Sequence, residues 1–275
     1  MTVSTPHKSP AIDELLDVMA RLRDPDHGCP WDKEQTFETI APYTIEEPYE
    51  VADAIETGDM DQLEDELGDL LFQVVFYAQM SREAGGFDFD AVARRISTKM
   101  RDRHPHVFGT VDERTSEGQT IAWETQKAQE REARAAKTGR KPSALDGVAL
   151  ALPALMRAQK LQKRAAREGF DWSELPPVIA KIREELAELE VEINAKADLA
   201  RLQDEAGDLL FASVNLARHL GVDAEIALRG TNAKFERRFR HVEGALENAG
   251  KTLKDANLDE MEAHWVDAKT AEKGS

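Results

Sequence analysis

Asp-Glu-Leu-Gly-Asp-Leu-Leu-Phe at 65–72 returns as Asp-Glu-Ala-Gly-Asp-Leu-Leu-Phe at 204–211, and this repetition decides how the rest of the sequence is interpreted. An acidic segment precedes each copy, Ile-Glu-Glu-Pro-Tyr-Glu-Val at 45–51 and Arg-Glu-Glu-Leu-Ala-Glu-Leu at 183–189. Basic residues and a tryptophan follow each copy at nearly the same spacing: Lys99, Arg103 and Trp123, then Lys234, Arg238 and Trp265. An internal repeat of this kind predicts two copies of one structural module.

Hydrophobic periodicity around the repeats predicts an all-α protein. Apolar residues recur at three- and four-residue spacing, while alternating stretches of Val, Ile and Thr are nearly absent. The 275 residues are enough for two modules, and residues 127–142 differ from both in being basic and alanine-rich, with Gly139 and Pro142 at the end. We therefore expect helical modules at 1–126 and 143–275, with 127–142 as a helix tail and linker.

Composition limits the classes of partner and compartment. A formal net charge of −17 argues against binding to a nucleic-acid backbone, which depends on neutralising phosphates. The single cysteine, Cys29, excludes an internal disulfide framework and a thiolate zinc site, and it favours a reduced cytoplasm. No apolar run approaches the roughly 20 residues that span a bilayer, so we expect neither a membrane anchor nor secretion.

The acidic segments place pairs of carboxylates on successive helices. Residues three apart are neighbours on a helix surface, so Glu-x-x-Glu and Glu-x-x-Asp can each present two carboxylates to one point. In the second module, an apolar stripe of Ile182, Leu186, Leu189 and Ile193 has the glutamates at its edge, and packing through such stripes would bring the acids together. The candidate metal ligands are Glu47, Glu50, Glu66 and Asp69, then Glu185, Glu188, Glu205 and Asp208.

Clustered oxygen ligands favour a hard cation, Mg²⁺ with Mn²⁺ as a substitute. Such ions can bridge phosphate oxygens, neutralise developing charge and activate water, as phosphoryl cleavage requires. The alternatives are solvated helix-surface acids, or a di-iron carboxylate site. Di-iron bundles use Glu-x-x-His on two helices, and no histidine follows any of the eight acids at that spacing.

Three further residue types in each half could hold a nucleotide. Lys234 and Arg238 lie one helical turn apart and can reach one phosphate chain, as can Lys99 and Arg103, although an ordinary basic patch has the same spacing. Trp265 and Trp123 can stack on a base or belong to the core. No glycine-rich phosphate loop is present.

The ensemble of motifs resembles the MazG family, two-module members of the all-α nucleotide pyrophosphatase superfamily, over nearly the whole chain. The resemblance rests on Cys-Pro-Trp-Asp-Lys-Glu-Gln-Thr at 29–36, residues 66–79, Arg-His-Pro-His-Val-Phe-Gly at 103–109, Ser-Ala-Leu-Asp-Gly-Val at 143–148, Gly-Phe-Asp-Trp at 169–172, and residues 204–239. It implies hydrolysis of NTPs and dNTPs to monophosphate and pyrophosphate with Mg²⁺, in nucleotide-pool housekeeping or stress, by dimers whose helices complete a four-helix bundle around each site.

Carried over by position, the resemblance makes Glu185, Glu188, Glu205 and Asp208 the metal-binding and catalytic acids of the second module. Lys234 and Arg238 become its phosphate contacts, and Trp265 a nucleotide contact. The first module has every counterpart, but Pro48 interrupts its first acid pair, and Thr44 with Glu47 has the pattern of a helix-capping box that would turn Glu47 toward the backbone. We therefore expect the second module to hold the main site.

Two other functions stay open at this point. One is a helical metal-binding scaffold without turnover. The other is a relative restricted to one substrate, such as dUTP or phosphoribosyl-ATP.

Overall fold

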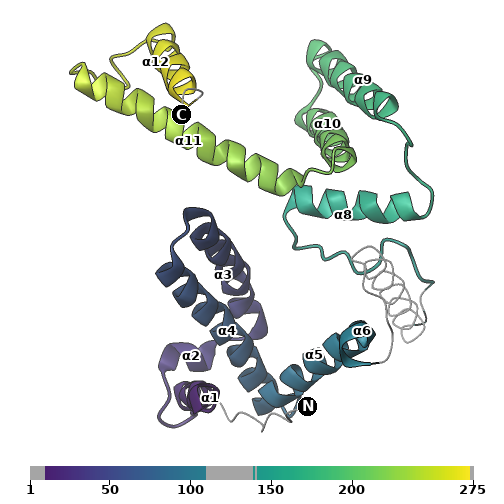
Figure 1. Ribbon diagram of the computed structural model, residues 1–275, viewed down its shortest axis with the longest axis vertical. Coiled ribbons are helices and arrows are strands. Elements are labelled where there is room, and N and C mark those ends of the chain that lie inside the picture. Colours follow the sequence, from purple (N-terminus) through teal and green to yellow (C-terminus); the bar gives the residue numbers. More distant parts are fainter. Residues whose placement is uncertain (1–9, 110–138, 140, 273–275) are drawn as a thin grey trace. The chain divides into compact units, whose positions relative to one another are not determined.

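The computed structural model describes residues 10–109, 139 and 141–272, and every regular element in these ranges is a helix. The described helices form two compact units, assigned to residues 1–126 and 127–275 (Figure 1). The prediction of an all-α fold is therefore confirmed. Most of the expected basic tail and linker at 127–142, and Trp123, lie outside the described residues. No described helix has the length and apolar character needed to cross a membrane.

The first unit is built on a long antiparallel helix pair. Its described helices are α1 (Pro10–Leu22), α2 (Pro30–Glu34), α3 (Phe37–Thr57), α4 (Met60–Glu83), α5 (Phe89–Arg103) and α6 (Pro105–Phe108). Helix α3 packs along α4, and α1 and α5 also pack on α4. The core joins α1, α3 and α4 through Met19, Ile40, Val75, Phe76 and Met80, each at most 5% exposed.

The second unit repeats this arrangement with different core chemistry. Its described helices are α8 (Ala154–Arg167), α9 (Leu175–Asn194), α10 (Leu199–His219), α11 (Ala224–Asn248) and α12 (Leu258–Ala271). Helix α9 packs along α10, α8 packs on α10 and α11, and α11 packs on α12. The buried side chains of α8, α9 and α10 are largely small or polar: Gln159, Gln162, Val178, Glu185, Glu205, Ala212, Val214 and Asn215.

Equivalent aspartates start equivalent helices in the two units. Asp59 before α4 accepts hydrogen bonds from the backbone N–H groups of Asp61 and Gln62, and Asp198 before α10 accepts one from the backbone N–H of Arg201. Each carboxylate satisfies donors that the first helical turn leaves without partners. The caps fix where both helices begin, and Glu66 and Glu205 therefore lie seven residues beyond their caps in each unit.

The helix that carries Glu47 begins earlier than the sequence suggested. Thr36 is the N-cap of α3 and forms the reciprocal capping box with Thr39. The predicted Thr44–Glu47 box is wrong, because the Thr44 hydroxyl donates to the Ile40 carbonyl and the Glu47 carboxylate accepts from the Gln73 amide. Pro48 lies inside α3 without ending it. Pro42 also lies inside α3, and each of the two prolines removes one backbone hydrogen bond of the helix. The packing of α3 along α4 keeps the helix continuous.

Candidate metal and nucleotide site

Three acids from two helices meet in the second unit. Glu185 and Glu188 on α9 and Glu205 on α10 each offer a carboxylate oxygen, and these atoms all lie within 4.8 Å of one another. Glu185 and Glu205 are only 5% and 8% exposed. Partial burial, followed by the charge of Glu185, raises the pKa of Glu188. Asp208, the fourth predicted ligand, lies outside this group of three but lines the adjoining pocket together with Glu185.

The first unit forms a similar group with a different membership. Glu47 on α3 and Glu66 and Asp69 on α4 offer oxygens within 4.8 Å of one another. Glu50 lies outside this group, although partial burial and the neighbouring carboxylates, Glu66 first, raise its pKa. In each module the helix pairing thus brings together three of the four acids that the sequence singled out.

The predicted apolar stripe on α9 is wrong in its orientation. Leu186 and Ile193 are 45% and 56% exposed, whereas Glu185 is buried. The face of α9 that packs on α10 is centred on Val178 and Glu185, which are seven residues, or two helical turns, apart. The carboxylate therefore lies within the helix interface rather than at its edge, which is the environment in which a shared cation or ion pair is most needed.

Two cations that the sequence analysis did not single out neutralise the buried acids of the second unit. The Lys181 ammonium lies 2.8 Å from Glu185 and 2.6 Å from Glu184, and these two glutamates raise its pKa. The Arg201 guanidinium donates to Glu205 at 2.7 Å and to Glu192 at 2.8 Å. The i,i+4 spacing of Lys181 to Glu185 and of Arg201 to Glu205 was the signal that could have identified them.

The first unit lacks both cations. With Glu47 aligned on Glu185 and Glu66 on Glu205, Tyr43 occupies the position of Lys181, and Gln62 that of Arg201. Neutral amides take over the contacts: Gln62 donates to Glu66 at 3.3 Å, and Gln73 donates to Glu47 at 3.1 Å. The two carboxylate groups are therefore alike in geometry and different in electrostatic environment.

The predicted phosphate contacts of the second unit lie on a separate helix pair. Lys234 and Arg238 are on α11 and Trp265 is on α12. Among the described helices, α11 packs on α8 and also contacts α10, and neither α11 nor α12 packs along α9. Arg238 donates to Glu272 at 2.7 Å and lies 5.7 Å from the centre of the Trp265 ring. Among the described contacts, Arg238 and Trp265 are thus brought to each other.

In the first unit the equivalent basic residues are on α5. Lys99 is exposed, and Arg103 is partly buried at the end of that helix. Helix α5 packs on α4, which also carries Glu66 and Asp69.

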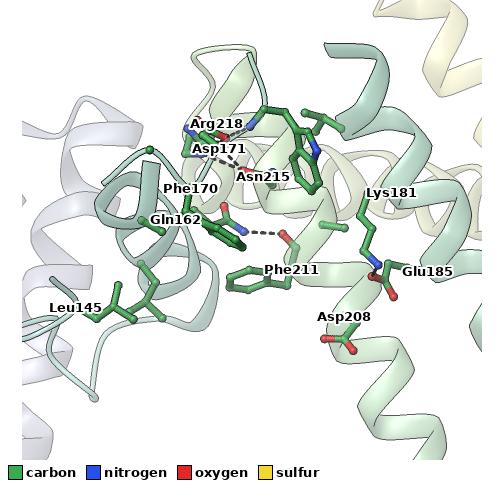
Figure 2. Close-up of a pocket in the computed structure, with 16 residues that line it drawn as sticks. Leu145, Gln162, Phe170, Asp171, Lys181, Glu185, Asp208, Phe211, Asn215 and Arg218 are labelled. Atoms are coloured by element: carbon green, nitrogen blue, oxygen red, sulfur yellow. Dashed lines mark hydrogen bonds and ion pairs between the residues drawn. The ribbon is translucent and has the colours of Figure 1, made fainter. Parts of the chain in front are cut away.

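A pocket of about 680 Å³ opens beside the acids of the second unit (Figure 2). Lys181, Glu185 and Asp208 lie at one end, and Asp171 and Arg218 lie at another side. Arg218 donates two hydrogen bonds to Asp171, at 2.6 and 2.9 Å, and this guanidinium lowers the pKa of Asp171. The ion pair holds the loop at 169–172 against α10.

The donor set fits a hard divalent cation. All of the clustered ligand atoms are carboxylate oxygens, and two of the three acids are buried where unscreened like charges repel strongly. Lys181 and Arg201 already compensate part of that charge and would be available to a polyanionic ligand once an ion binds. Oxygen ligands of this kind suit Mg²⁺ or Mn²⁺.

Comparison with known proteins agrees with these features. The MazG nucleotide pyrophosphohydrolase domain matches residues 35–108 and again 176–243, and each match contains one carboxylate group. The chain is 55% identical over 262 residues to the nucleoside triphosphate pyrophosphohydrolase of Escherichia coli strain K12, covering 95% of this chain and 98% of that protein.

Two further relatives carry related names. A nucleoside triphosphate pyrophosphohydrolase/pyrophosphatase MazG of Thermotoga maritima is 42% identical over 259 residues, which are 94% of this chain and 95% of that protein. A nucleoside triphosphate pyrophosphohydrolase of Mycobacterium tuberculosis is 36% identical over 172 residues, which are 62% of this chain and 50% of that protein.

Proposed function

Because the chain belongs to the MazG nucleotide pyrophosphohydrolase family, we propose that the acids of its second unit hold the Mg²⁺ with which it cleaves nucleoside triphosphates. The chain is a nucleoside triphosphate pyrophosphohydrolase, an enzyme that releases pyrophosphate and leaves the monophosphate. The ligands are Glu185, Glu188, Glu205 and Asp208. When bound, the ion supplies charge neutralisation at the phosphates and activates water.

One observation carries the choice of unit. Glu185 and Glu205 are buried next to each other with a lysine and an arginine already paired to them, and a large pocket begins at Glu185. A triphosphate bound through a divalent cation brings more negative charge than one ion neutralises. Lys181 and Arg201 can exchange their carboxylate partners for phosphate oxygens. In the second unit the acids would then bind the cation, and the two basic residues would bind the phosphates. Glu47, Glu50, Glu66 and Asp69 form the weaker metal site.

We assign the phosphate and nucleotide contacts to two molecules of the chain. Lys234, Arg238 and Trp265 are on α11 and α12, neither of which packs along α9, although α11 also contacts α10; we infer that a second copy of the chain brings them to the acids. Apolar side chains on α9, α10 and α11 remain uncovered: Leu186 is 45%, Leu210 60% and Ile226 68% exposed. Exposed apolar surface of this extent is typical of an interface. Lys99 and Arg103 have the same role in the first unit, with Trp123 as its nucleotide contact.

We place the enzyme in the cytoplasm, which fits a sequence with a single cysteine and a reaction on free nucleotides.

The test is incubation with each NTP and dNTP, separation of the products, and titration of metal. Monophosphate plus pyrophosphate, formed with Mg²⁺ or Mn²⁺ and lost in excess chelator, is the expected result. Diphosphate plus phosphate would place the cleavage elsewhere on the triphosphate chain. Cleavage of a single nucleotide, such as dUTP, would replace broad specificity by the restricted alternative, and binding without turnover would leave a metal-binding scaffold.

A further inference from the structure

Arg201 contacts two carboxylates of different kinds through one nitrogen. Its Nη2 atom lies 2.7 Å from Glu205 and 2.8 Å from Glu192, and because this nitrogen carries two hydrogens, each contact takes one N–H. Glu205 belongs to the group of three acids that could bind a metal, whereas Glu192 lies outside that group. The hydrogen bond to Glu192 is also the main cause that raises the pKa of Arg201. Arg201 is therefore attached both to the candidate metal site and to a carboxylate beyond it.

The repeat shows which residues the first module has at the position of this outer carboxylate. Lys196 and Gly58, with φ of 52° and 73°, lie in the turns after α9 and α3, and Glu192 and Ala54 lie four residues before them. The backbone carbonyls of Glu192 and Ala54 accept equivalent hydrogen bonds from these turns, of 3.0 and 3.2 Å. The two modules thus share this backbone, but the first has an alanine in place of the acid and a glutamine in place of the arginine. A pair that is present together in one module and replaced together in the other is expected of two residues that act jointly.

A divalent cation bound at Glu205 would change the surroundings of Arg201. The cation draws on the charge of that carboxylate and repels the guanidinium beside it. Arg201 is largely exposed, so a guanidinium without a firm partner would turn into the solvent, where its side chain regains rotamer freedom. Asp204, at 3.3 Å, is itself exposed and holds the arginine weakly. Glu192 is more buried and is not one of the clustered acids, so it keeps its charge and its hydrogen bond.

We propose that Glu192 is a positioning residue, which keeps Arg201 beside the acids when a cation takes Glu205. One N–H of Nη2 then stays on Glu192, and the N–H released from Glu205 donates to a phosphate oxygen of the substrate. The inference rests on the proposed function, because it needs a cation at Glu205 and a ligand that carries phosphates. It assigns Glu192 no contact with the metal or with the substrate.

The first experiment removes the charge of Glu192 and keeps its shape. Calorimetry on the full chain measures the affinity of Glu192→Gln for Mn²⁺ alone and for the Mn²⁺ complex of α,β-methylene ATP, which is not cleaved. We expect the affinity for the nucleotide complex to fall about three- to tenfold, because Arg201 is no longer held. The affinity for Mn²⁺ alone should change by no more than about threefold, because Glu192 acts on the cation only as a distant charge. An unchanged nucleotide affinity, or a loss of Mn²⁺ affinity as large as the nucleotide loss, would overturn the proposal.

The second experiment asks whether Glu192 acts through Arg201. In an Arg201→Met background, adding Glu192→Gln should leave the affinity for the nucleotide complex within about a factor of two, because the residue to be positioned is already gone. A further loss as large as that in the wild-type background would overturn the proposal. Urea unfolding without metal tests the purely structural alternative, in which the ion pair only joins α9 to α10. Lower stability of Glu192→Gln with full nucleotide affinity would establish that alternative and refute the positioning role.

Two further variants complete the comparison. Glu190→Gln removes the same charge from an exposed residue of α9 that lies about 200° around the helix from Glu192, and it should bind the nucleotide complex as the wild type does. An equal loss in this control would refute the proposal, since the general charge of the helix would then explain the effect. Glu192→Ala carries the residue that the first module has at this position, and it replaces Glu192→Gln if that variant does not fold. A wild-type protein that does not bind Mn²⁺ would instead refute the proposed metal site, so the two failures are distinguishable.

Discussion

Replacing Glu185 and Glu47 by glutamine in separate variants tests whether the two units contribute unequally. The residues are equivalent in the repeat, yet Glu185 is paired to Lys181 at 2.8 Å while Glu47 accepts from the Gln73 amide at 3.1 Å. Glutamine keeps the shape of the side chain and removes its charge. The comparison therefore isolates what the charge does in each unit.

The expected effect on stability is small. The two carboxylates lie within 4.8 Å of each other, so at an effective dielectric constant of about 20 the repulsion between Glu185 and Glu205 is about 3.5 kcal/mol or more. Glu185→Gln relieves this repulsion and loses the attraction to Lys181, which keeps Glu184 as a partner at 2.6 Å. Because the two changes oppose each other, we expect the free energy of unfolding without metal to change by no more than about 1 kcal/mol.

The expected effect on catalysis is large and confined to one unit. A charged group that acts on the developing charge of the reaction is worth about 10²- to 10³-fold in kcat, and we expect Glu185→Gln to lose at least that much. Glu47→Gln should keep kcat within about a factor of two, because the site that turns over is elsewhere. Pyrophosphate release under saturating substrate and Mg²⁺ measures both, and urea unfolding checks the fold. A large loss in Glu47→Gln with an active Glu185→Gln would refute the reasoning and exchange the roles of the units.

Three further predictions follow from the same contacts. Mg²⁺ at about 100 times its dissociation constant should raise the free energy of unfolding by about 2.7 kcal/mol, measured as a rise in Tm that Glu205→Gln abolishes; an equal rise in that variant would contradict the metal assignment. Arg218 lowers the pKa of Asp171 in the folded protein. The ion pair therefore contributes fully to the free energy of unfolding above the pKa of about 3.9 that Asp171 has in the unfolded chain, and this contribution is lost as the pH falls through the lower pKa of the folded protein. Asp171→Asn should therefore flatten the acid limb of stability against pH, and an unchanged limb would count against the ion pair. The chain should be at least dimeric by light scattering, and Leu210→Lys should dissociate it; a fully active wild-type monomer would refute the shared site.

The sequence predicted the architecture well because its strongest signals are local or repeated. Three-and-four spacing of apolar residues depends only on helix geometry, and the duplicated Asp-Glu-x-Gly-Asp segment identifies two modules without any knowledge of their packing. The groups of acids could also be predicted from local sequence, since two residues three apart share a helix face. Three of four acids in each module lie together as a result.

What the sequence missed depends on packing between helices. The direction in which α9 presents Glu185 is set by the contact of α9 with α10. The apolar stripe through Leu186 predicted a different packing face, but Leu186 is exposed in a single chain. Thr44 and Glu47 matched a capping pattern, but Thr36 starts the helix two turns earlier.

The most direct test of the central claim is separation of the products from a triphosphate labelled at the α-phosphate, with Mg²⁺, for the wild type and for Glu185→Gln. We predict labelled monophosphate and unlabelled pyrophosphate from the wild type, and loss of both products in the variant at unchanged fold. Labelled diphosphate from the wild type, or full wild-type turnover by Glu185→Gln, would contradict the claim.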